Sequence, residues 1–334
     1  MKEKVVLGMS GGVDSSVAAL LLQKKGYEVI GTFMKNYSSN KNVLTGECNW
    51  RDDYRVAKRI AIMLGIKLYL VDYEKEYREK VIDKMYEDYK KGLTPNPDIL
   101  CNKIIKFPVL FEQMRKFGAN KIATGHYSRM ERRGKKFYLR MAKDKDKDQS
   151  YFIFDIRQDW LDKILFPIGV LKKEEVRRIA RENGFDNWDR KGTKGICFIG
   201  KIDFKEFLKK KINKKNGKIF FEDGKEIGKH FGDYFTIGER FRESYGEIDR
   251  KTLGKYVNSK LYVYSKKENN IFVCLEGSEK LKRNEIQIRE LHLIDLKENI
   301  TGKRFRARIR HLGQLYWGKI VKNGTKYSFF FDKK

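Results

Sequence analysis

A short glycine-rich segment between an apolar strand and a helix constrains the fold of this chain most. It reads Ser10-Gly11-Gly12-Val13-Asp14-Ser15-Ser16, after a strand expected over 4–9 and before a helix expected over 15–25. Adjacent glycines let the backbone approach an anion, and the serine hydroxyls and the helix N-terminus add hydrogen-bond donors. The Gly-Lys-Ser/Thr ending of a Walker A loop is absent, which disfavours γ-phosphate hydrolysis of the usual P-loop kind. The segment therefore predicts a phosphate-binding turn at the end of a strand.

The first 130 residues alternate between strand and helix patterns, and one more helix pattern follows them. Further strands are expected over 27–34, 67–71 and 121–124, and helices over 53–64, 74–91 and 172–183. Such alternation predicts a parallel sheet covered by helices on both faces.

The pattern changes after about residue 205. Short β-type runs punctuated by Gly and Asn are expected over 218–222, 234–237, 260–264, 271–275, 285–294, 304–309 and 314–321. They predict β-rich modules, and the lysine-rich stretch 209–218 predicts a linker. We therefore expect an α/β chain of three units. These are an N-terminal parallel-sheet nucleotide-binding domain over 1–205, a small central β-rich domain over 206–280, and a C-terminal β-barrel-like module over 281–334.

The charge of the chain favours a polyanionic partner. There are 74 Lys+Arg against 45 Asp+Glu, a formal net charge of +29. Such a surplus repels itself unless a polyanion binds, although a lysine-rich proteome would give the same composition. Residues 301–331 contain eight Lys or Arg and no acid, and Arg304, Arg306, Arg308 and Arg310 alternate with other residues. A period of two places these four guanidinium groups on one strand face, where a phosphate backbone would relieve their repulsion.

Cysteine usage and hydropathy exclude several classes of protein. Four cysteines, none in a CxxC pair, are too few for a disulfide scaffold and give little support for a zinc site. The longest apolar run, Val17–Leu22, is too short to span a bilayer, and Val5-Val6-Leu7 is too short for the apolar region of a signal peptide. We therefore expect a cytoplasmic protein with no membrane contact and no protein-ligated metal centre.

Two cysteines lie in segments framed by proline or glycine. In Thr94-Pro95-Asn96-Pro97-Asp98-Ile99-Leu100-Cys101-Asn102, a carboxylate and a thiol lie three residues apart. If a helix begins near Asp98, both side chains lie on one face, and the helix N-terminus stabilises the Cys101 thiolate. In Gly192–Gly200, glycines and lysines surround Cys197. Either cysteine alone is more often an inert buried thiol, but the shared framing favours a reactive pair. Cys48 and Cys274 lack this framing, and we interpret them as structural.

These motifs together resemble a known family. SGGVDSS resembles the loop of the PP-loop ATP pyrophosphatase superfamily, whose members cleave ATP between the α- and β-phosphates. Within that superfamily the chain looks like the tRNA-specific 2-thiouridylases, which place sulfur on the wobble uridine. The matching segments are TPNPDILCNKIIKF (94–107), ATGHYSR (123–129), KDQSYF (147–152), LFPIG (165–169), KGICFIG (194–200) and DFKEFL (203–208). The resemblance is dense over residues 4–208 and thinner beyond.

The resemblance implies a role for each matching residue. Cys101 would be the nucleophile, Cys197 would hold the persulfide, and Asp98 could move a proton. Asp14 would lie near pyrophosphate and Mg²⁺, unless it only caps its helix, and His126 would lie near the nucleotide, unless it only makes a local hydrogen bond. The expected ATP contacts are Gly8, Met9, Ser10, Gly11, Gly12, Val13, Asp14, Ser15, Met34, Gly125 and His126. The expected tRNA contacts are Asn96, Pro97, Asp98, Lys147, Asp148, Gln149, Arg308 and Arg310.

The implied reaction begins with transfer of AMP from ATP to O2 of the uracil, which makes that oxygen a good leaving group. Sulfur then passes from the Cys197 persulfide, and Cys101 takes the inner sulfur and forms a disulfide. The sequence is compatible both with direct attack by the persulfide on C2 and with release of sulfide before the attack. A cysteine desulfurase or a sulfur-relay protein would supply the sulfur. Two alternatives are another PP-loop enzyme of the ligase or amidotransferase kind that acts on a small carboxylate, and a non-catalytic RNA-binding relative. The paired cysteines count against the first, and the intact loop counts against the second.

The C-terminal third departs from the family pattern. Thr236-Ile237-Gly238-Glu239-Arg240 continues as Phe241-Arg242-Glu243 instead of the family's Gly-Gln-Arg-Lys-Gly-Leu type of stretch. The usual final Pro-Gly-Gln…Phe-Tyr strand pair is absent, and the sequence ends Phe329-Phe330-Phe331-Asp332-Lys333-Lys334. We therefore expect a C-terminal module that is shortened or closed differently.

Overall fold

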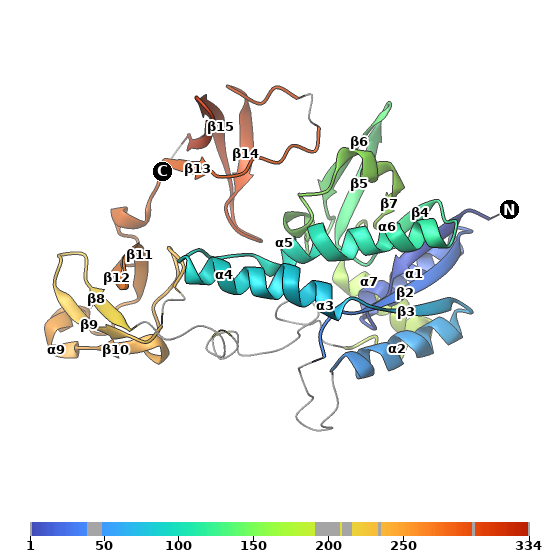
Figure 1. The fold of residues 1–334 in the computed structure, drawn as a ribbon, viewed down its shortest axis with the longest axis horizontal. Coiled ribbons are helices and arrows are strands. Elements are labelled where there is room, and N and C mark those ends of the chain that lie inside the picture. The colour runs from blue at the N-terminus through green and yellow to red at the C-terminus, as the bar shows by residue number, and fades with distance from the viewer. Residues whose placement is uncertain are drawn as a thin grey trace.

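A computed structural model describes residues 2–38, 49–190, 208, 216–232, 235–295 and 298–332. Its strands form three main sheets, one in each third of the chain, and a separate two-stranded hairpin (Figure 1). No helix in these described ranges is long and apolar enough to cross a membrane.

The N-terminal sheet has five parallel strands in the order β3-β2-β1-β4-β7. The strands are β1 (Lys4–Gly8), β2 (Glu28–Lys35), β3 (Lys67–Asp72), β4 (Lys121–Thr124) and β7 (Ile164–Leu165). The prediction of an α/β fold with a parallel sheet is confirmed. Because β2 lies on one side of β1 and β4 on the other, the chain diverges at the carboxyl end of β1, where open α/β sheets bind ligands.

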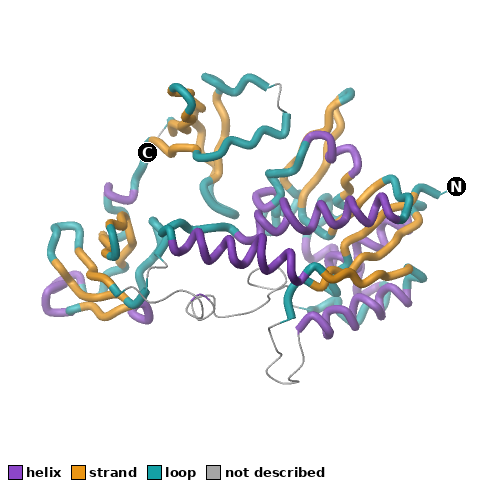
Figure 2. The backbone as a smooth tube through the Cα atoms, viewed as in Figure 1, coloured by secondary structure: helices purple, strands orange, loops and turns teal. Residues whose placement is uncertain are grey.

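Helices cover both faces of this sheet (Figure 2). One face holds α1 (Val13–Lys24), α2 (Asn49–Met63) and α7 (Lys173–Glu182). The other holds α3 (Glu74–Tyr77), the π-turn η1 (Arg78–Asp83), α4 (Lys84–Lys90), α5 (Pro97–Cys101), the π-turn η2 (Asn102–Lys106) and α6 (Phe107–Lys116). Two cores result, because Val5 and Leu7 of β1 pack on the first face and Val6 packs on the second.

The single helix expected over 74–91 is interrupted in the structure. It runs as α3, η1 and α4, so one π-type turn separates two α-helical pieces. A π-turn has a wider hydrogen-bond spacing than the α-helix and is frequent at functional sites.

A hairpin that the sequence patterns did not predict follows β4. It is built from β5 (Ser128–Arg133) and β6 (Lys136–Met141), joined at a turn with Gly134 at φ +58°. The short helices η3 (Ser150–Phe152) and η4 (Gln158–Lys163) then lead to β7.

The central sheet has the order β10-β9-β8-β12-β11, with β8 and β12 parallel and the other pairs antiparallel. Its strands are β8 (Gly217–Phe220), β9 (Glu226–His230), β10 (Gly246–Ile248), β11 (Leu261–Lys267) and β12 (Asn270–Leu275). The short helices are η5 (Glu243–Tyr245), α9 (Arg250–Leu253), η6 (Gly254–Tyr256) and η7 (Glu279–Leu281). The strand expected over 234–237 is wrong for its described part, because Glu239 N donates to Thr236 O (3.0 Å) in a turn that Gly238 completes at φ +84°.

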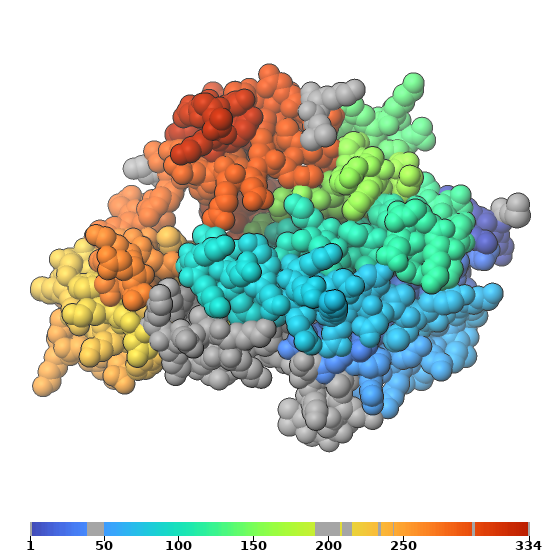
Figure 3. All heavy atoms as spheres, in the orientation of Figure 1, coloured from blue at the N-terminus to red at the C-terminus, as the bar shows by residue number. Residues whose placement is uncertain are grey.

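The C-terminal sheet is antiparallel, in the order β13-β16-β15-β14. Its strands are β13 (Glu285–Ile288), β14 (Arg304–Arg308), β15 (Leu315–Asn323) and β16 (Lys326–Phe331). The sequence lacks the family's usual ending. Its aromatic run Phe329–Phe331 forms part of β16, which pairs with β13 on one side and with β15 on the other. Figure 3 shows an opening through the molecule between this sheet, the central module and α4.

Candidate active site

The glycine-rich loop connects β1 to α1 and leaves the N-terminus of α1 without a side-chain cap. Gly12 is the N-cap residue, and its carbonyl accepts from the hydroxyls of Ser15 (2.9 Å) and Ser16 (3.1 Å). Ser10 N donates to Ser15 Oγ at 3.2 Å, which folds the loop back onto the helix. Because no side chain caps the first backbone N–H groups of α1 with a hydrogen bond, this helix end can bind an anion.

Two glycines allow backbone segments to meet at this loop. Gly11 has φ +74°, and a Cβ there would collide with the backbone carbonyl of Asp53 in α2. Gly125, just after β4, lies so close to α1 that a Cβ would be 2.8 Å from Ser15 N. Both of these expected ATP-binding residues are therefore required as glycine by packing alone.

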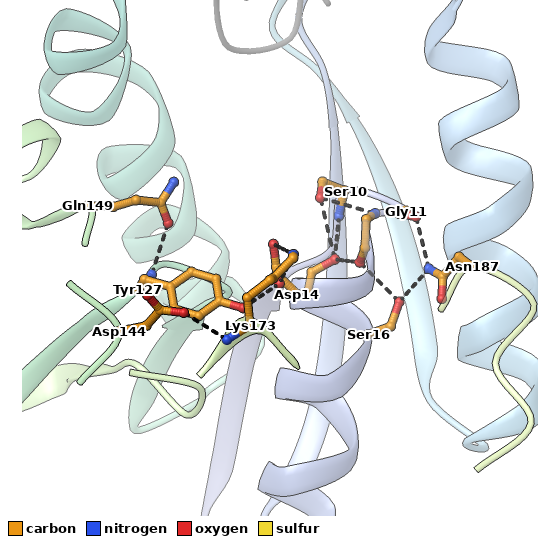
Figure 4. Close-up of polar contacts among 11 residues, drawn as sticks. Ser10, Gly11, Asp14, Ser16, Tyr127, Asp144, Gln149, Lys173 and Asn187 are labelled. Carbon is orange, nitrogen blue, oxygen red and sulfur yellow. Dashed lines mark hydrogen bonds and ion pairs between the residues drawn. The ribbon is translucent and has the colours of Figure 1, made fainter. Parts of the chain in front are cut away.

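Residues near 190 hold the loop from the far side (Figure 4). Asn187 is buried, and its Nδ2 donates to Gly11 O and to Ser16 Oγ, both at 3.0 Å. Arg190 donates to Gly11 O (3.2 Å) and pairs with Asp53 (2.6 Å). Neither residue is indicated by the sequence, because contacts with a loop more than 170 positions away leave no local pattern.

Asp14, in the first turn of α1, is held by two partners outside the loop. Lys173 Nζ lies 2.6 and 2.8 Å from its two carboxylate oxygens, and Tyr127 Oη donates to it at 3.0 Å (Figure 4). Burial, followed by the Asp14 charge, raises the pKa of Tyr127 well above its usual value, which keeps the hydroxyl a donor. The N-cap is Gly12, so Asp14 is not the capping residue of α1.

His126 makes local hydrogen bonds at the end of β4. It is buried, with Nδ1 2.8 Å from Thr124 Oγ1 and Nε2 3.4 Å from Lys106 Nζ. Burial and the nearby Lys106 lower the pKa of His126 well below its usual value, so the ring is neutral. Because an ammonium group only donates, Nε2 is the acceptor and Nδ1 carries the proton toward Thr124. These contacts match the alternative in which His126 only makes local hydrogen bonds.

The remaining residues expected at the nucleotide are part of the protein core. Met9, Val13 and Met34 are each at most 5% exposed. Gly8 is the last residue of β1 and faces Leu110 of α6. A Cβ added at Gly8 would be in ordinary van der Waals contact with Leu110. Among the described residues no group of three or more His, Cys, Asp or Glu could hold a metal ion.

The segment with the first cysteine forms a capped helix. Asn96 is the N-cap of α5, and its Oδ1 accepts from Asp98 N and Ile99 N, both at 3.2 Å. Pro97 occupies the first helical position, and Asp98 and Cys101 follow three residues apart. The predicted helix start is confirmed. Cys101 is fully buried, at the point where α5 passes into the π-turn η2.

The residues expected to contact tRNA differ in exposure. Lys147 is exposed. Gln149 instead holds the backbone of Tyr127, donating from its N to Tyr127 O (2.8 Å) and accepting at Oε1 from Tyr127 N (2.9 Å). Asp148 is fully buried and pairs with Arg308 of β14 at 3.1 Å.

The arginine face of β14 is neutralised in part within the protein. Arg304 pairs with Asp332, and Arg304 and Arg306 lie over the Trp317 ring, 5.3 and 5.5 Å from its centroid. Arg310 is exposed beyond the end of the strand. Relief of repulsion on this face therefore does not require phosphate at every arginine.

The other cysteines divide into two cases. Cys274 of β12 is buried, and burial raises the pKa of its thiol, in agreement with a structural role. Cys197 and Cys48, with the whole KGICFIG segment, lie outside the described residues.

The sequence of this chain is similar to those of known proteins over most of its length. The family model described as "tRNA methyl transferase HUP domain" matches residues 3–201. The chain is 44% identical over 278 residues to tRNA-specific 2-thiouridylase MnmA 1 of Geobacillus kaustophilus (strain HTA426), covering 83% of this chain and 73% of that protein. It is 43% identical over 296 residues to tRNA-specific 2-thiouridylase MnmA of Malacoplasma penetrans (strain HF-2), covering 84% and 77%. The corresponding protein of Pediococcus pentosaceus (strain ATCC 25745 / CCUG 21536 / LMG 10740 / 183-1w) is 39% identical over 321 residues, covering 94% and 83%.

Proposed function

This chain belongs to the tRNA-specific 2-thiouridylase family, and we propose that it replaces the C2 oxygen of the wobble uridine of tRNA with sulfur, using ATP to activate that oxygen. The observation that supports this most is the helix α5. Asn96 caps its N-terminus, and it carries Asp98 and Cys101 three residues apart. Cys101 of this helix belongs to the same core as Val6 of β1, the central strand of the sheet, and β1 leads into the uncapped turn before α1. A carboxylate, a thiol and a phosphate site are the groups that adenylation followed by sulfur transfer requires.

The loop residues would bind the triphosphate of ATP. The N–H groups at the start of α1 and the hydroxyl of Ser10 would donate to phosphate oxygens and stabilise the charge that develops on departing pyrophosphate, while the Ser15 hydroxyl is already donated to Gly12 O. Mg²⁺ takes most of its ligands from phosphates and water and needs few protein carboxylates. Asp14 would be its carboxylate ligand once Lys173, which lies 2.6 and 2.8 Å from the two Asp14 oxygens, moves toward the phosphates. Bound there, Mg²⁺ would supply further charge neutralisation to the leaving pyrophosphate.

The cysteine side of the site would transfer sulfur. The terminal sulfur of a Cys197 persulfide attacks C2 of the adenylated uracil, AMP leaves with the former carbonyl oxygen, and the Cys101 thiolate attacks the inner sulfur. The products are 2-thiouridine, AMP and a Cys101–Cys197 disulfide, which a reductant must open before the next cycle. Asp98 would accept or return a proton at the uracil. A cysteine desulfurase or a relay protein would recharge Cys197.

The burial of Cys101 sets a condition on this mechanism. A fully buried thiol cannot reach an extruded base unless the covering residues move when tRNA binds. The basic partner surface would include the exposed Lys147 and Arg310.

The direct test measures pyrophosphate release and nucleoside products together. Purified protein is incubated with ATP, Mg²⁺, a persulfide donor, and tRNA transcribed without modification. We expect pyrophosphate release that depends on tRNA, and 2-thiouridine detected by mass spectrometry of the digested tRNA. Pyrophosphate release with a small carboxylate and no tRNA would favour a ligase instead, and tRNA binding without any ATP cleavage would favour a non-catalytic RNA-binding protein.

A further inference from the structure

A buried ion pair joins the C-terminal sheet to the catalytic part of the chain. The Asp148 carboxylate is fully buried and accepts from Ala142 N (2.9 Å), Ser150 Oγ (2.8 Å) and an Arg308 guanidinium nitrogen (3.1 Å). The Arg308 side chain is only 14% exposed. Family resemblance predicts that both residues contact RNA, yet in the structure they form an ion pair with each other.

A short path of contacts leads from this pair to the cysteine helix. Directly after Arg308, Ile309 O accepts from Tyr151 Oη at 3.3 Å, and the His311 ring lies 4.3 Å from the ring of Phe152. The carbonyl of Phe152 accepts from Asn102 Nδ2 at 3.0 Å, and Asn102 is the residue after Cys101. The turn that follows β14 is therefore docked, through η3, onto the junction of α5 and η2.

The chemistry of Asp148 argues against a direct RNA contact. A buried carboxylate cannot meet a phosphate, and its negative charge would repel one. A buried guanidinium with a carboxylate partner is instead a geometric constraint, because removal of either partner leaves the other charge buried and unpaired.

We propose that Asp148 and Arg308 are positioning residues of the thiolation site. Their ion pair fixes the turn over residues 309–313 against the helix that bears Asp98 and Cys101, so the C-terminal sheet and the catalytic domain enclose the target base as one unit. This inference rests on the proposed thiolation of tRNA.

A second set of contacts keeps the two parts together when the pair is broken. His292 Nδ1 lies 2.9 Å from Asp155, which also pairs with Lys103 of η2 at 2.6 Å, and Lys136 of β6 pairs with Asp295 at 2.5 Å. Loss of the Asp148–Arg308 pair therefore loosens the position of the turn and does not detach the sheet.

The test compares Asp148→Asn, Arg308→Gln and the double variant. Asp148→Asn is nearly isosteric and keeps an oxygen for Ala142 N. We expect each single variant to lower kcat for thiolation by about tenfold to a hundredfold, as expected for a misplaced reacting group. The double variant should be no worse than the worse single variant, because both remove the same contact. The dependence of tRNA affinity on salt concentration should keep its slope.

The alternative interpretation, in which Arg308 contacts the tRNA backbone, predicts different results in the same experiments. If Arg308 binds phosphate, Arg308→Gln reduces the salt slope of tRNA binding by about one counterion. In that reading Asp148→Asn binds tRNA equally or more tightly and keeps its kcat, because a negative charge has been removed. Either of these outcomes overturns the proposal.

Hydrogen exchange provides a readout that does not depend on activity. In Asp148→Asn, amides of β14 and of η3 should exchange faster than in wild type, while β1 and β2 remain protected. Unchanged exchange at both β14 and η3 would overturn the proposal. Arg59→Gln on α2, which breaks the exposed ion pair of Arg59 with Asp186, is the matched control and should change neither kcat nor exchange at these elements.

The design separates this inference from the proposed function. If wild type forms no 2-thiouridine under any sulfur supply, the proposed function fails, and the kinetic part of the positioning proposal fails with it. If wild type is active and Asp148→Asn is equally active, only the positioning proposal fails.

Discussion

The ammonium group of Lys173 lies 2.6 Å from one carboxylate oxygen of Asp14 and 2.8 Å from the other, although 159 positions separate the residues. This pair ties the first turn of α1, beside the phosphate loop, to the start of α7. It also cancels the one acidic charge of the loop where a triphosphate would bind.

Lys173→Gln should raise the KM for ATP about tenfold, because an unpaired Asp14 would repel the phosphates by roughly 1–2 kcal/mol. Pyrophosphate release at varied ATP concentration measures the change. Added Mg²⁺ should recover part of the loss, since the carboxylate can then bind the cation. Lys173→Arg keeps the charge and should stay within about twofold of wild type. An equal defect in both variants would show that packing and not charge matters here.

Gly125→Ala should abolish ATP-dependent pyrophosphate release and lower thermal stability. The added Cβ would lie 2.8 Å from Ser15 N and 2.9 Å from the carbonyl carbon of Asp14, so the first turn of α1 must move. A shift of about 1 Å at a reacting site costs roughly a hundredfold in rate. Gly118→Asn, at a φ of +59° that asparagine tolerates and with nothing within 4 Å of an added Cβ, is the control. Normal turnover by Gly125→Ala would contradict the packing argument.

Asn96→Ala should reduce thiolation at saturating tRNA, because α5 loses an N-cap that stabilises it by about 1 kcal/mol. Asn96→Asp retains the acceptor for Asp98 N and Ile99 N and should recover most of the rate. If Asn96 instead acts through a direct contact of its amide N–H group with the base, the aspartate variant will be as poor as the alanine variant. Single-turnover formation of 2-thiouridine distinguishes the two cases.

His126 should make the protein less stable at mildly acidic pH. Burial and Lys106 hold the folded pKa of His126 well below its unfolded value of about 6.5. As pH falls below that unfolded value, protons bind the unfolded chain preferentially, so stability is lost at a rate of up to about 1.4 kcal/mol per pH unit. Thermal midpoints at pH 7.5 and 5.5 should differ more for wild type than for His126→Gln. Equal differences would show that His126 titrates normally in the fold.

Cys101→Ser and Cys197→Ser should each abolish formation of 2-thiouridine while tRNA-dependent pyrophosphate release continues, because adenylation precedes sulfur transfer. Mass spectrometry and a pyrophosphate assay on the same sample separate the two steps. Cys274→Ser removes a buried thiol from the central sheet and should remain active. Full thiolation by either single variant would reject the role assigned to that cysteine.

Local sequence patterns predicted the elements whose signals are local. The parallel strands, the start of α5 at a proline next to an Asn cap, and the glycine-rich turn all depend on residues within a few positions of one another. The strand expected over 234–237 was wrong for the part that the structure describes, although the signal was again local. A turn closed by Glu239 N and Thr236 O, with Gly238 at positive φ, replaces it.

Contacts between distant segments could not be predicted in the same way. Asn187 and Arg190 hold the loop across more than 170 positions, and nothing in their own neighbourhood indicates a partner. The alternation of arginines correctly placed Arg304, Arg306 and Arg308 in a strand but was wrong for Arg310, which lies beyond the end of β14. It also did not reveal that Arg308 pairs with a buried carboxylate. A pattern of positive charge in one segment indicates that it would bind negatively charged groups. Only the fold shows whether those groups belong to a ligand or to the protein itself.

The two cores of the N-terminal sheet have a consequence for how this protein tolerates change. The loop residues Met9 and Val13 draw their rigidity from the core beneath α1, α2 and α7, whereas Cys101 belongs to the core beneath α4 and α6. Met34, which is also expected at the nucleotide, belongs to the same core as Cys101, so that core touches both halves of the expected site. A cavity made beneath α1, α2 and α7 should therefore disturb the loop at Met9 and Val13 while leaving the surroundings of Cys101 intact, whereas a cavity made beneath α4 and α6 should disturb both.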